Sequence, residues 1–298
     1  MFDVSFLKTI DNMVTTPSSL PDQKQKSAPL LKFLGKIPWT WVITFVYLAF
    51  LLILPIAAML TKAASEPFAS FWKTATSPLA LSSYEITFVT AFAAAAVNGV
   101  FGTLIAWVLV RYDFFGKRFL EAVVDLPFAL PTAVAGLTLA TVYSEKGWIG
   151  SLFVPSGFKI AFTRLGVWLA MMFISLPFIV RTVQPVLTEL EKEIEEAAWS
   201  LGASKFQTFV QVILPPLTPA ILTGVALGFS RAVGEYGSTV IIASNTPFKD
   251  LITPVLIFQR LEQYDYVGAT VIGVVMLGIS FVSLLAINLL QAWSKRYG

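Results

Sequence analysis

The chain has 298 residues, of which 56% are hydrophobic and only 13% charged, and its mean hydropathy is +0.75. Soluble domains carry about a quarter charged residues, so most of this chain is expected to lie in lipid. Because the sequence contains neither cysteine nor histidine, it excludes disulfides, the usual zinc sites and any imidazole-based triad.

The N-terminal 36 residues are polar and include five lysines and three prolines. They contain no apolar run long enough for the core of a signal peptide. We therefore expect residues 1–36 to form a disordered cytoplasmic tail. A plastid-type transit peptide is the alternative, but the segment has no arginine and contains three aspartates.

Six apolar segments follow, and each is long enough to cross a bilayer. About 20 helical residues, at about 1.5 Å each, span a hydrocarbon core of about 30 Å. The segments lack the alternation of barrel strands, and backbone groups in lipid must be satisfied internally. We expect an all-α, polytopic fold in which residues 37–298 form one transmembrane domain, with spans at 39–60, 86–110, 120–143, 165–185, 212–243 and 267–292.

Prolines interrupt the third and fifth of these segments. Pro127 and Pro131 lie near the start of the third, and Pro215, Pro216 and Pro219 lie near the start of the fifth. Proline removes a backbone donor and clashes with the preceding turn. Both spans are therefore predicted to be kinked.

The distribution of lysine and arginine predicts the orientation, because cytoplasmic loops are enriched in both. With the N-terminus inside, 13 basic residues fall on the cytoplasmic side and seven on the other. Without the tail the numbers are eight and seven, so the tail carries much of this prediction. Both termini are expected in the cytoplasm.

The fourth connection, residues 188–211, is a cytoplasmic loop in this topology and has the pattern of two short helices. Thr188 and Glu191 have the spacing of a capping box, which predicts a helix start. Gly202 is placed to end that helix in a left-handed turn, and a second helix can begin at Ala203. The first helix would carry one apolar stripe made of Leu187, Leu190, Ile194, Ala198 and Leu201.

An apolar stripe does not tell whether lipid or protein covers it, so an amphipathic connector lying on the membrane is the alternative. The acidic residues of the loop argue against contact with an anionic leaflet. A rigid helix pair that docks onto a cytoplasmic partner is the other interpretation.

Seven residues at fixed spacing in this loop resemble the EAA signature of ABC importer permeases. The resemblance implies a type I importer permease fold and a loop that inserts into a groove of a separate ATPase and transmits its motion. Valine stands at the position where the family usually has isoleucine. The residues are Glu196, Ala197, Ala198, Gly202, Val212, Leu214 and Pro215.

The chain lacks the means to hydrolyse ATP itself by the usual route. A P-loop has the pattern GxxxxGK[ST], and the pairs Gly35–Lys36 and Gly116–Lys117 lack both the upstream glycine and the following hydroxyl residue. We expect a non-catalytic transport subunit that depends on ABC ATPase subunits, with no cofactor, no metal and no nucleic-acid partner.

Two further stretches, residues 125–150 and 228–247, resemble the T-type permease of sulfate/thiosulfate importers. Molybdate and tungstate permeases share the outline of both stretches, and the run from Gly234 to Ser238 favours sulfate. The resemblance implies a second, W-type permease, a periplasmic sulfate-binding protein and a place in the bacterial plasma (inner) membrane.

Arg231 and Glu235 lie inside the fifth apolar segment. A central arginine costs on the order of 3 kcal/mol on insertion scales, so it should face a partner or water. In one interpretation the two residues neutralise each other and fix the helix against its neighbours. In the other, Arg231 lies on the path of an oxyanion together with the hydroxyls of Ser230 and Ser238.

Gly224 and Gly228 form a GxxxG pattern on the same segment. The pattern lets another helix approach closely, and packing within the bundle is favoured over a subunit interface. Two other classes of protein remain as alternatives. A secondary anion carrier would need ionisable groups at the midplane, and an intramembrane enzyme would lack its usual histidine and cysteine chemistry.

Overall fold

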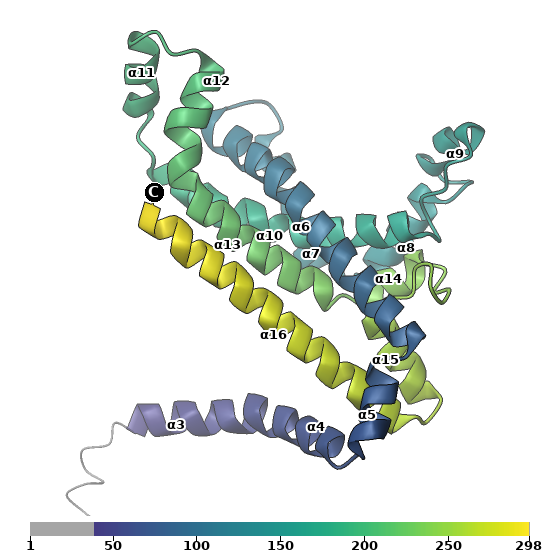
Figure 1. Cartoon of the computed structure of the whole chain (residues 1–298). Coiled ribbons are helices and arrows are strands. Elements are labelled where there is room, and N and C mark those ends of the chain that lie inside the picture. The colour runs from purple at the N-terminus through teal and green to yellow at the C-terminus, as the bar shows by residue number, and fades with distance from the viewer. Residues whose placement is uncertain (1–38, 298) are drawn as a thin grey trace, which may run out of the picture. The chain divides into compact units, whose positions relative to one another are not determined.

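The computed structural model describes residues 39–297, which form helices and connections without any strand (Figure 1). The predicted tail, residues 1–36, lies outside these described residues. The chain divides into two units, Met1–Ile56 and Ala57–Gly298. The elements in chain order are α3 (Trp39–Leu48), η1 (Ala49–Ile53), α4 (Leu54–Ala64), α5 (Phe68–Ala75), α6 (Pro78–Arg111), α7 (Lys117–Ala129), α8 (Thr132–Tyr143), α9 (Gly150–Phe153), η2 (Val154–Ser156), α10 (Arg164–Glu189), α11 (Lys192–Ser200), α12 (Lys205–Thr208), η3 (Phe209–Ile213), α13 (Leu214–Val233), α14 (Gly237–Ile242), α15 (Thr253–Glu262) and α16 (Tyr266–Tyr297).

Within the described residues, five helices are long and apolar enough to cross a membrane. They are Trp39–Ala64, Pro78–Arg111, Arg164–Glu189, Lys205–Val233 and Tyr266–Leu289. The count becomes six if α7 and α8 together make one span. The all-α prediction is confirmed, and the structure alters the third and fifth predicted spans.

The predicted span 120–143 is two helices rather than one kinked helix. The helices α7 and α8 meet at an angle of 118°, and Leu130 between them is extended, with φ −84° and ψ 134°. Pro131 follows it, and a proline disfavours the helical conformation in the residue before it. Pro127 lies inside α7 and is tolerated there.

The prolines of the fifth span are accommodated by a wider helical turn. A proline clashes with the carbonyl four residues earlier. In the π-helical turn η3 the Leu214 N–H instead donates to the Phe209 carbonyl, five residues back, just before Pro215. The turn η1 has the same form, with the Leu54 N–H donating to the Ala49 carbonyl just before Pro55.

The predicted span 212–243 is also too long. The helix α13 ends at Val233, and α14 begins only at Gly237, so Glu235 lies in the connection between them. The connection reads Gly234, Glu235 and Tyr236 and is followed by Gly237, but the apolar residues on both sides keep the hydropathy of a span-length window high, so hydropathy alone did not reveal the break. The Glu235 side chain links the two helices by contacts with Arg231 of α13 and Ser238 of α14, as described below.

The centre of the second unit is formed by α6, α10 and α13, which pack against one another. Ile179 of α10 lies where glycines of both neighbours leave room for it. A Cβ atom added at Gly224 would lie 3.0 Å from the Ile179 Cα atom, and one at Gly102 or Gly228 would meet the Ile179 side chain. The GxxxG pattern therefore serves packing within the bundle, as predicted. Asn98 of α6 adds a polar link, donating to the Met172 carbonyl at 2.8 Å.

The two helix breaks lie next to each other, because α14 packs against α8. A Cβ atom at Gly136 of α8 would lie 2.7 Å from the Ser238 Cα atom. A Cβ atom at Gly237 would meet the side chain of Thr132, the first residue of α8. The start of α14 is thus in contact with the start of α8, and the breaks at residues 130–131 and 234–236 share one region of the bundle.

Candidate functional site

The connection after α10 consists of the short helix α11 and a turn at Gly202, which leads into α12, the first turn of the spanning helix Lys205–Val233. The Gly202 backbone is left-handed, with φ +89°. The Gly202 N–H donates to the Trp199 carbonyl at 2.9 Å, and the Ala203 N–H donates to the Ala198 carbonyl at 3.0 Å. These are the two bonds of a Schellman motif, which ends a helix at a residue that tolerates positive φ. The predicted glycine turn is confirmed.

The helix α12 begins with a capping box. Ser204 accepts a hydrogen bond from the Gln207 N–H through its hydroxyl, and the Gln207 side chain accepts one from the Ser204 N–H. Each side chain satisfies a backbone donor that has no partner within the helix. The second predicted helix is therefore present, with Lys205 rather than Ala203 as its first residue.

The capping box predicted at Thr188 and Glu191 is wrong. Thr188 lies in the last turn of α10, and its hydroxyl donates to the Gln184 carbonyl. Such bonding to the carbonyl four residues back is available to threonine inside a helix. Glu191 is instead the residue that precedes α11, without a side-chain cap bond. The predicted apolar stripe is wrong as well, because Leu187 is buried in α10 whereas Leu201 is 90% exposed.

The residues that resemble the EAA signature form a mostly exposed surface. Glu196, Ala197, Gly202 and Pro215 are exposed, whereas Ala198, Val212 and Leu214 are partly buried. Large apolar side chains next to them are also exposed, with Leu201 at 90% and Phe206 at 76%. The knuckle, defined here as α11, Gly202 and α12, therefore presents small, acidic and apolar groups outward.

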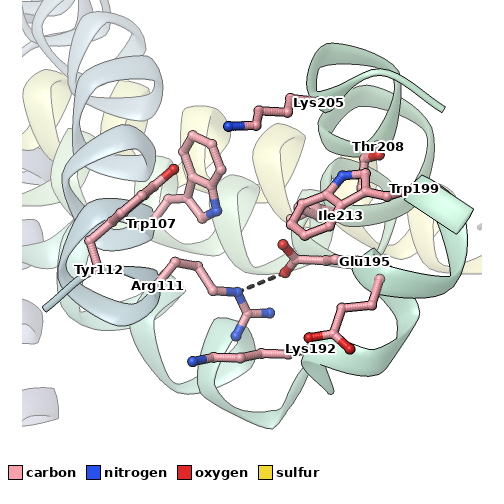
Figure 2. Close-up of a pocket in the computed structure, with 10 residues that line it drawn as sticks. Trp107, Arg111, Tyr112, Lys192, Glu195, Trp199, Lys205, Thr208 and Ile213 are labelled. Carbon is pink, nitrogen blue, oxygen red and sulfur yellow. Dashed lines mark ion pairs between the residues drawn. The ribbon is translucent and has the colours of Figure 1, made fainter. Parts of the chain in front are cut away.

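A cavity of about 240 Å³ lies behind the knuckle, between α11 and the end of α6 (Figure 2). Trp107 and Trp199 face each other across it. Below them Arg111 Nε and Glu195 Oε1 are 2.7 Å apart, and the two side chains are only 8% and 10% exposed. The lining residues are Trp107, Arg111, Tyr112, Lys192, Glu195, Glu196, Trp199, Lys205, Thr208 and Ile213.

Sequence analysis did not single out Arg111 or Glu195 as functional residues. Arg111 was counted only among the basic residues at cytoplasmic helix ends. Its partner is 84 positions away, and no local spacing rule links residues at that distance. A second ion pair, between Asp113 and Lys117, is nearby in sequence but exposed. The Lys117 ammonium hydrogen-bonds to Asp113 and lowers the pKa of that carboxyl below its ordinary value.

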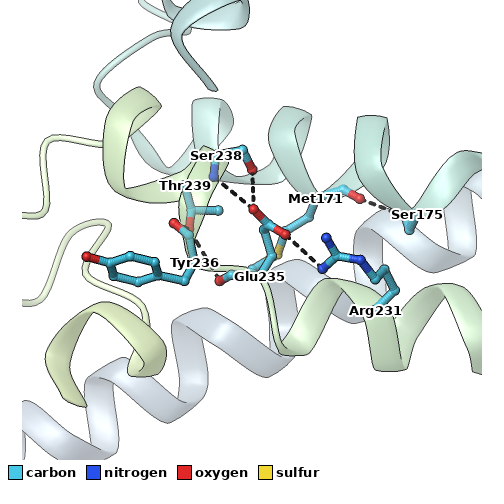
Figure 3. A network of polar contacts seen from close by, with 7 residues as sticks. All are labelled: Met171, Ser175, Arg231, Glu235, Tyr236, Ser238 and Thr239. Carbon is cyan, nitrogen blue, oxygen red and sulfur yellow. Dashed lines mark hydrogen bonds and ion pairs between the residues drawn. The ribbon is translucent and has the colours of Figure 1, made fainter. Parts of the chain in front are cut away.

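Arg231 and Glu235 form the ion pair that their spacing predicted, at 2.8 Å (Figure 3). The Glu235 carboxylate also accepts hydrogen bonds from the N–H and the hydroxyl of Ser238, each at 2.8 Å. Its side chain is 2% exposed, whereas that of Arg231 is 31% exposed. Glu235 thereby joins the end of α13 to the first turn of α14.

The two serines predicted to lie near an anion path differ in their contacts. The Ser238 hydroxyl donates to Glu235 and is fully buried. The Ser230 hydroxyl donates to the Ala226 carbonyl of its own helix at 3.0 Å. Of the four candidate path residues, Arg231, Glu235 and Ser238 are brought together, and Ser230 is one residue away on α13.

The family to which the chain belongs follows from its sequence. The pattern of the family described as "Binding-protein-dependent transport system inner membrane component" matches residues 98–296. The chain belongs to this family. It is a membrane-spanning permease subunit, and the resemblance found in the EAA segment is confirmed.

Three similar members of the family have been named as sulfate permeases. The "Sulfate transport system permease protein CysT" of Synechocystis sp. is 66% identical over 265 residues, which cover 89% of this chain and 93% of that protein. The protein of the same name from Synechococcus elongatus is 63% identical, covering 90% and 98%. A "Probable sulfate transport system permease protein cysT" of Chlorokybus atmophyticus is 63% identical, covering 87% and 91%.

Solved structures of permeases share the fold at low identity. A chain of a bacterial ABC transporter that imports the acidic polysaccharide alginate has a TM-score of 0.72 at 14% identity, covering 89% of this chain and 99% of that one. A chain from the bacterial alginate transporter in complex with an alginate pentasaccharide-bound periplasmic protein has a TM-score of 0.68 at 16% identity. The match covers 87% of this chain and 94% of that one. The predicted permease fold is thus confirmed.

Proposed function

We propose that this chain is the membrane permease subunit of an ATP-driven importer of sulfate or thiosulfate. The observation that carries the proposal is the knuckle, in which a Schellman turn at Gly202 joins α11 to the start of the fifth span and leaves Glu196, Ala197 and Gly202 exposed. The high identity to permeases named for sulfate transport supports the substrate. The subunit itself is non-catalytic in this proposal, and ATP is hydrolysed by a partner.

The assembly has the parts that binding-protein-dependent transport requires. Two copies of an ABC ATPase hold the knuckles, and a second, W-type permease completes the pathway through the lipid bilayer. A periplasmic sulfate-binding protein delivers the anion to the outer face of the bacterial plasma (inner) membrane. Closure of the ATPase pair pushes Glu196, Ala197, Ala198 and Gly202 and turns the helices between inward-open and outward-open arrangements.

The anion path in this proposal runs past the adjoining helix breaks. Arg231 supplies a positive charge there, and its partly exposed guanidinium can attract an oxyanion. Glu235 and Ser238 hold the arginine and the start of α14 in place. Irregular backbone at membrane depth is tolerated where it lines a cavity or is buried in protein, and transporters place substrate sites at such breaks.

Uptake measurements test the proposed substrate. The chain is expressed with its ATPase, second permease and binding protein in a bacterial strain that lacks sulfate import. We expect the strain to regain growth on sulfate as the sole sulfur source and to accumulate radiolabelled sulfate. An excess of thiosulfate should reduce this accumulation, and the same excess of molybdate should not. If molybdate reduces the accumulation of sulfate and thiosulfate does not, the sulfate assignment is contradicted.

A further inference from the structure

Arg111 connects the ends of three helices. It is the last residue of α6, where a cation is favourable because the helix dipole is negative at that end. Its Nη2 donates to the Leu190 carbonyl, at the end of α10, at 3.0 Å. Carbonyls at a helix end have no partner within the helix. Its Nε forms the buried ion pair with Glu195 of α11 at 2.7 Å.

The other main contacts of α11 are with α12 and η3, which are the first turns of the spanning helix Lys205–Val233. Packing therefore connects α11 to the fifth span, whereas its connection to α6 and α10 runs through Arg111. Toward α6 it faces the cavity of about 240 Å³ (Figure 2). The ion pair between Arg111 and Glu195 therefore bridges a region where packing between α6 and α11 is incomplete.

The two sides of α11 have different surroundings. Glu195 is buried on the side toward α6, whereas its neighbours Glu196 and Ala197, which are about 100° and 200° further around the helix, are exposed. A partner that pushes the exposed side moves Glu195 with it. Because Glu195 forms an ion pair with Arg111, and Arg111 donates to the Leu190 carbonyl, the displacement is passed to the ends of α6 and α10.

We propose that the Arg111–Glu195 pair is a positioning link that passes movement of α11 to the spanning helices α6 and α10. The proposal rests on the function proposed above and adds the route of the coupling within this chain. Neither residue meets the transported anion or ATP in this role. Their loss should change how much transport each ATP drives, rather than ATP hydrolysis itself.

The test compares variants of the complete transporter in proteoliposomes. With Glu195→Gln or Arg111→Gln we expect the sulfate transported per ATP hydrolysed to fall about tenfold, the size of a typical coupling between sites. Basal ATP hydrolysis should persist, because the knuckle still docks. The exchanged pair Arg111→Glu with Glu195→Arg should recover part of the lost ratio, since it restores opposite charges across the cavity.

The exposed pair of Asp113 and Lys117 provides the matched control. Asp113→Asn removes a carboxylate of an ion pair of similar length, 2.9 Å, two residues from Arg111, and should leave the ratio unchanged. An unchanged ratio in Glu195→Gln would overturn the proposal. So would a fall in ATP hydrolysis proportional to the fall in uptake, because that result would indicate lost docking.

A second readout does not depend on the substrate. The chain has no cysteine, so Phe115→Cys, in the connection after α6, and Ser200→Cys, at the end of α11, can be spin-labelled in a full complex whose other subunits lack reactive cysteines. The label pair measures the distance between that connection and α11. We expect Glu195→Gln to broaden this distance distribution and Asp113→Asn to leave it as in the parent. An equally narrow distribution in Glu195→Gln would refute the link. If the parent complex moves no sulfate while Glu195→Gln still broadens the distribution, the proposed substrate is refuted and the link is retained.

Discussion

Replacing Glu235 with alanine is expected to abolish assembly of the transporter. The carboxylate is buried and binds Arg231 together with the N–H and hydroxyl of Ser238. Without this carboxylate the buried N–H and hydroxyl of Ser238 lose their acceptor, at about 1–3 kcal/mol for each unsatisfied group, and Arg231 loses its partner inside an apolar segment. The amount of permease in membranes and the thermal unfolding of the purified complex measure the effect.

Ser230→Ala is the matched control for this variant. Its hydroxyl donates only within α13, to the Ala226 carbonyl, so its loss should change neither assembly nor thermal unfolding appreciably. Normal assembly and stability of Glu235→Ala would contradict the account of the break between α13 and α14.

Arg231→Gln separates the two interpretations of this pair. We expect it to assemble, because the glutamine amide can still donate a hydrogen bond to the buried Glu235 carboxylate, which also keeps its bonds to Ser238. Sulfate uptake by the assembled variant should be reduced if the guanidinium attracts the anion. Unchanged uptake with normal assembly would show that Arg231 does not act on the anion path. The function of Arg231 would then be its ion pair with Glu235.

Gly202→Val is expected to cause a severe loss of uptake while the spanning helices remain folded. A β-branched residue is strongly disfavoured at the positive φ of this turn, and the left-handed conformation costs about 1–2 kcal/mol for a residue with a Cβ atom. The strain falls on the two hydrogen bonds that end α11. Uptake per assembled complex and binding of the ATPase to the permease measure the consequence.

Gly157→Val is the control for backbone strain. Gly157 also has positive φ, +73°, and a Cβ atom there would meet nothing within 4 Å, as at Gly202. It follows the short turn η2 and lies outside the knuckle. It should therefore retain uptake and ATPase binding. Equal losses in the two variants would indicate that strain, and not the knuckle, explains the effect.

The parts of the fold that depend on local rules were predictable from the sequence. The long apolar segments identify the spans, and Gly202 identifies the turn because few other residues accept its conformation. The GxxxG residues identify a close helix contact, although not that Ile179 would occupy it. In each case the physical cause lies within a few positions of the residue concerned.

The parts that depend on distant residues were not predictable. Apolar residues lie on both sides of the break after Val233, and an apolar residue suits lipid whether its helix continues or ends. The direction of the chain after Pro131 is set by the packing of α8 against α14. Arg111 and Glu195 meet only because α6 and the knuckle come together. A threonine near a helix end can act as a cap or bond to the preceding turn, and Thr188 does the latter.

The central claim is that this permease depends on ATP hydrolysis by a partner that holds the knuckle. The most direct test measures sulfate uptake into proteoliposomes that contain both permeases and the binding protein, with the ATPase subunits either present or omitted. We expect ATP-dependent accumulation with the ATPase and no more than passive leakage without it. Accumulation against a gradient in the absence of the ATPase would contradict the claim.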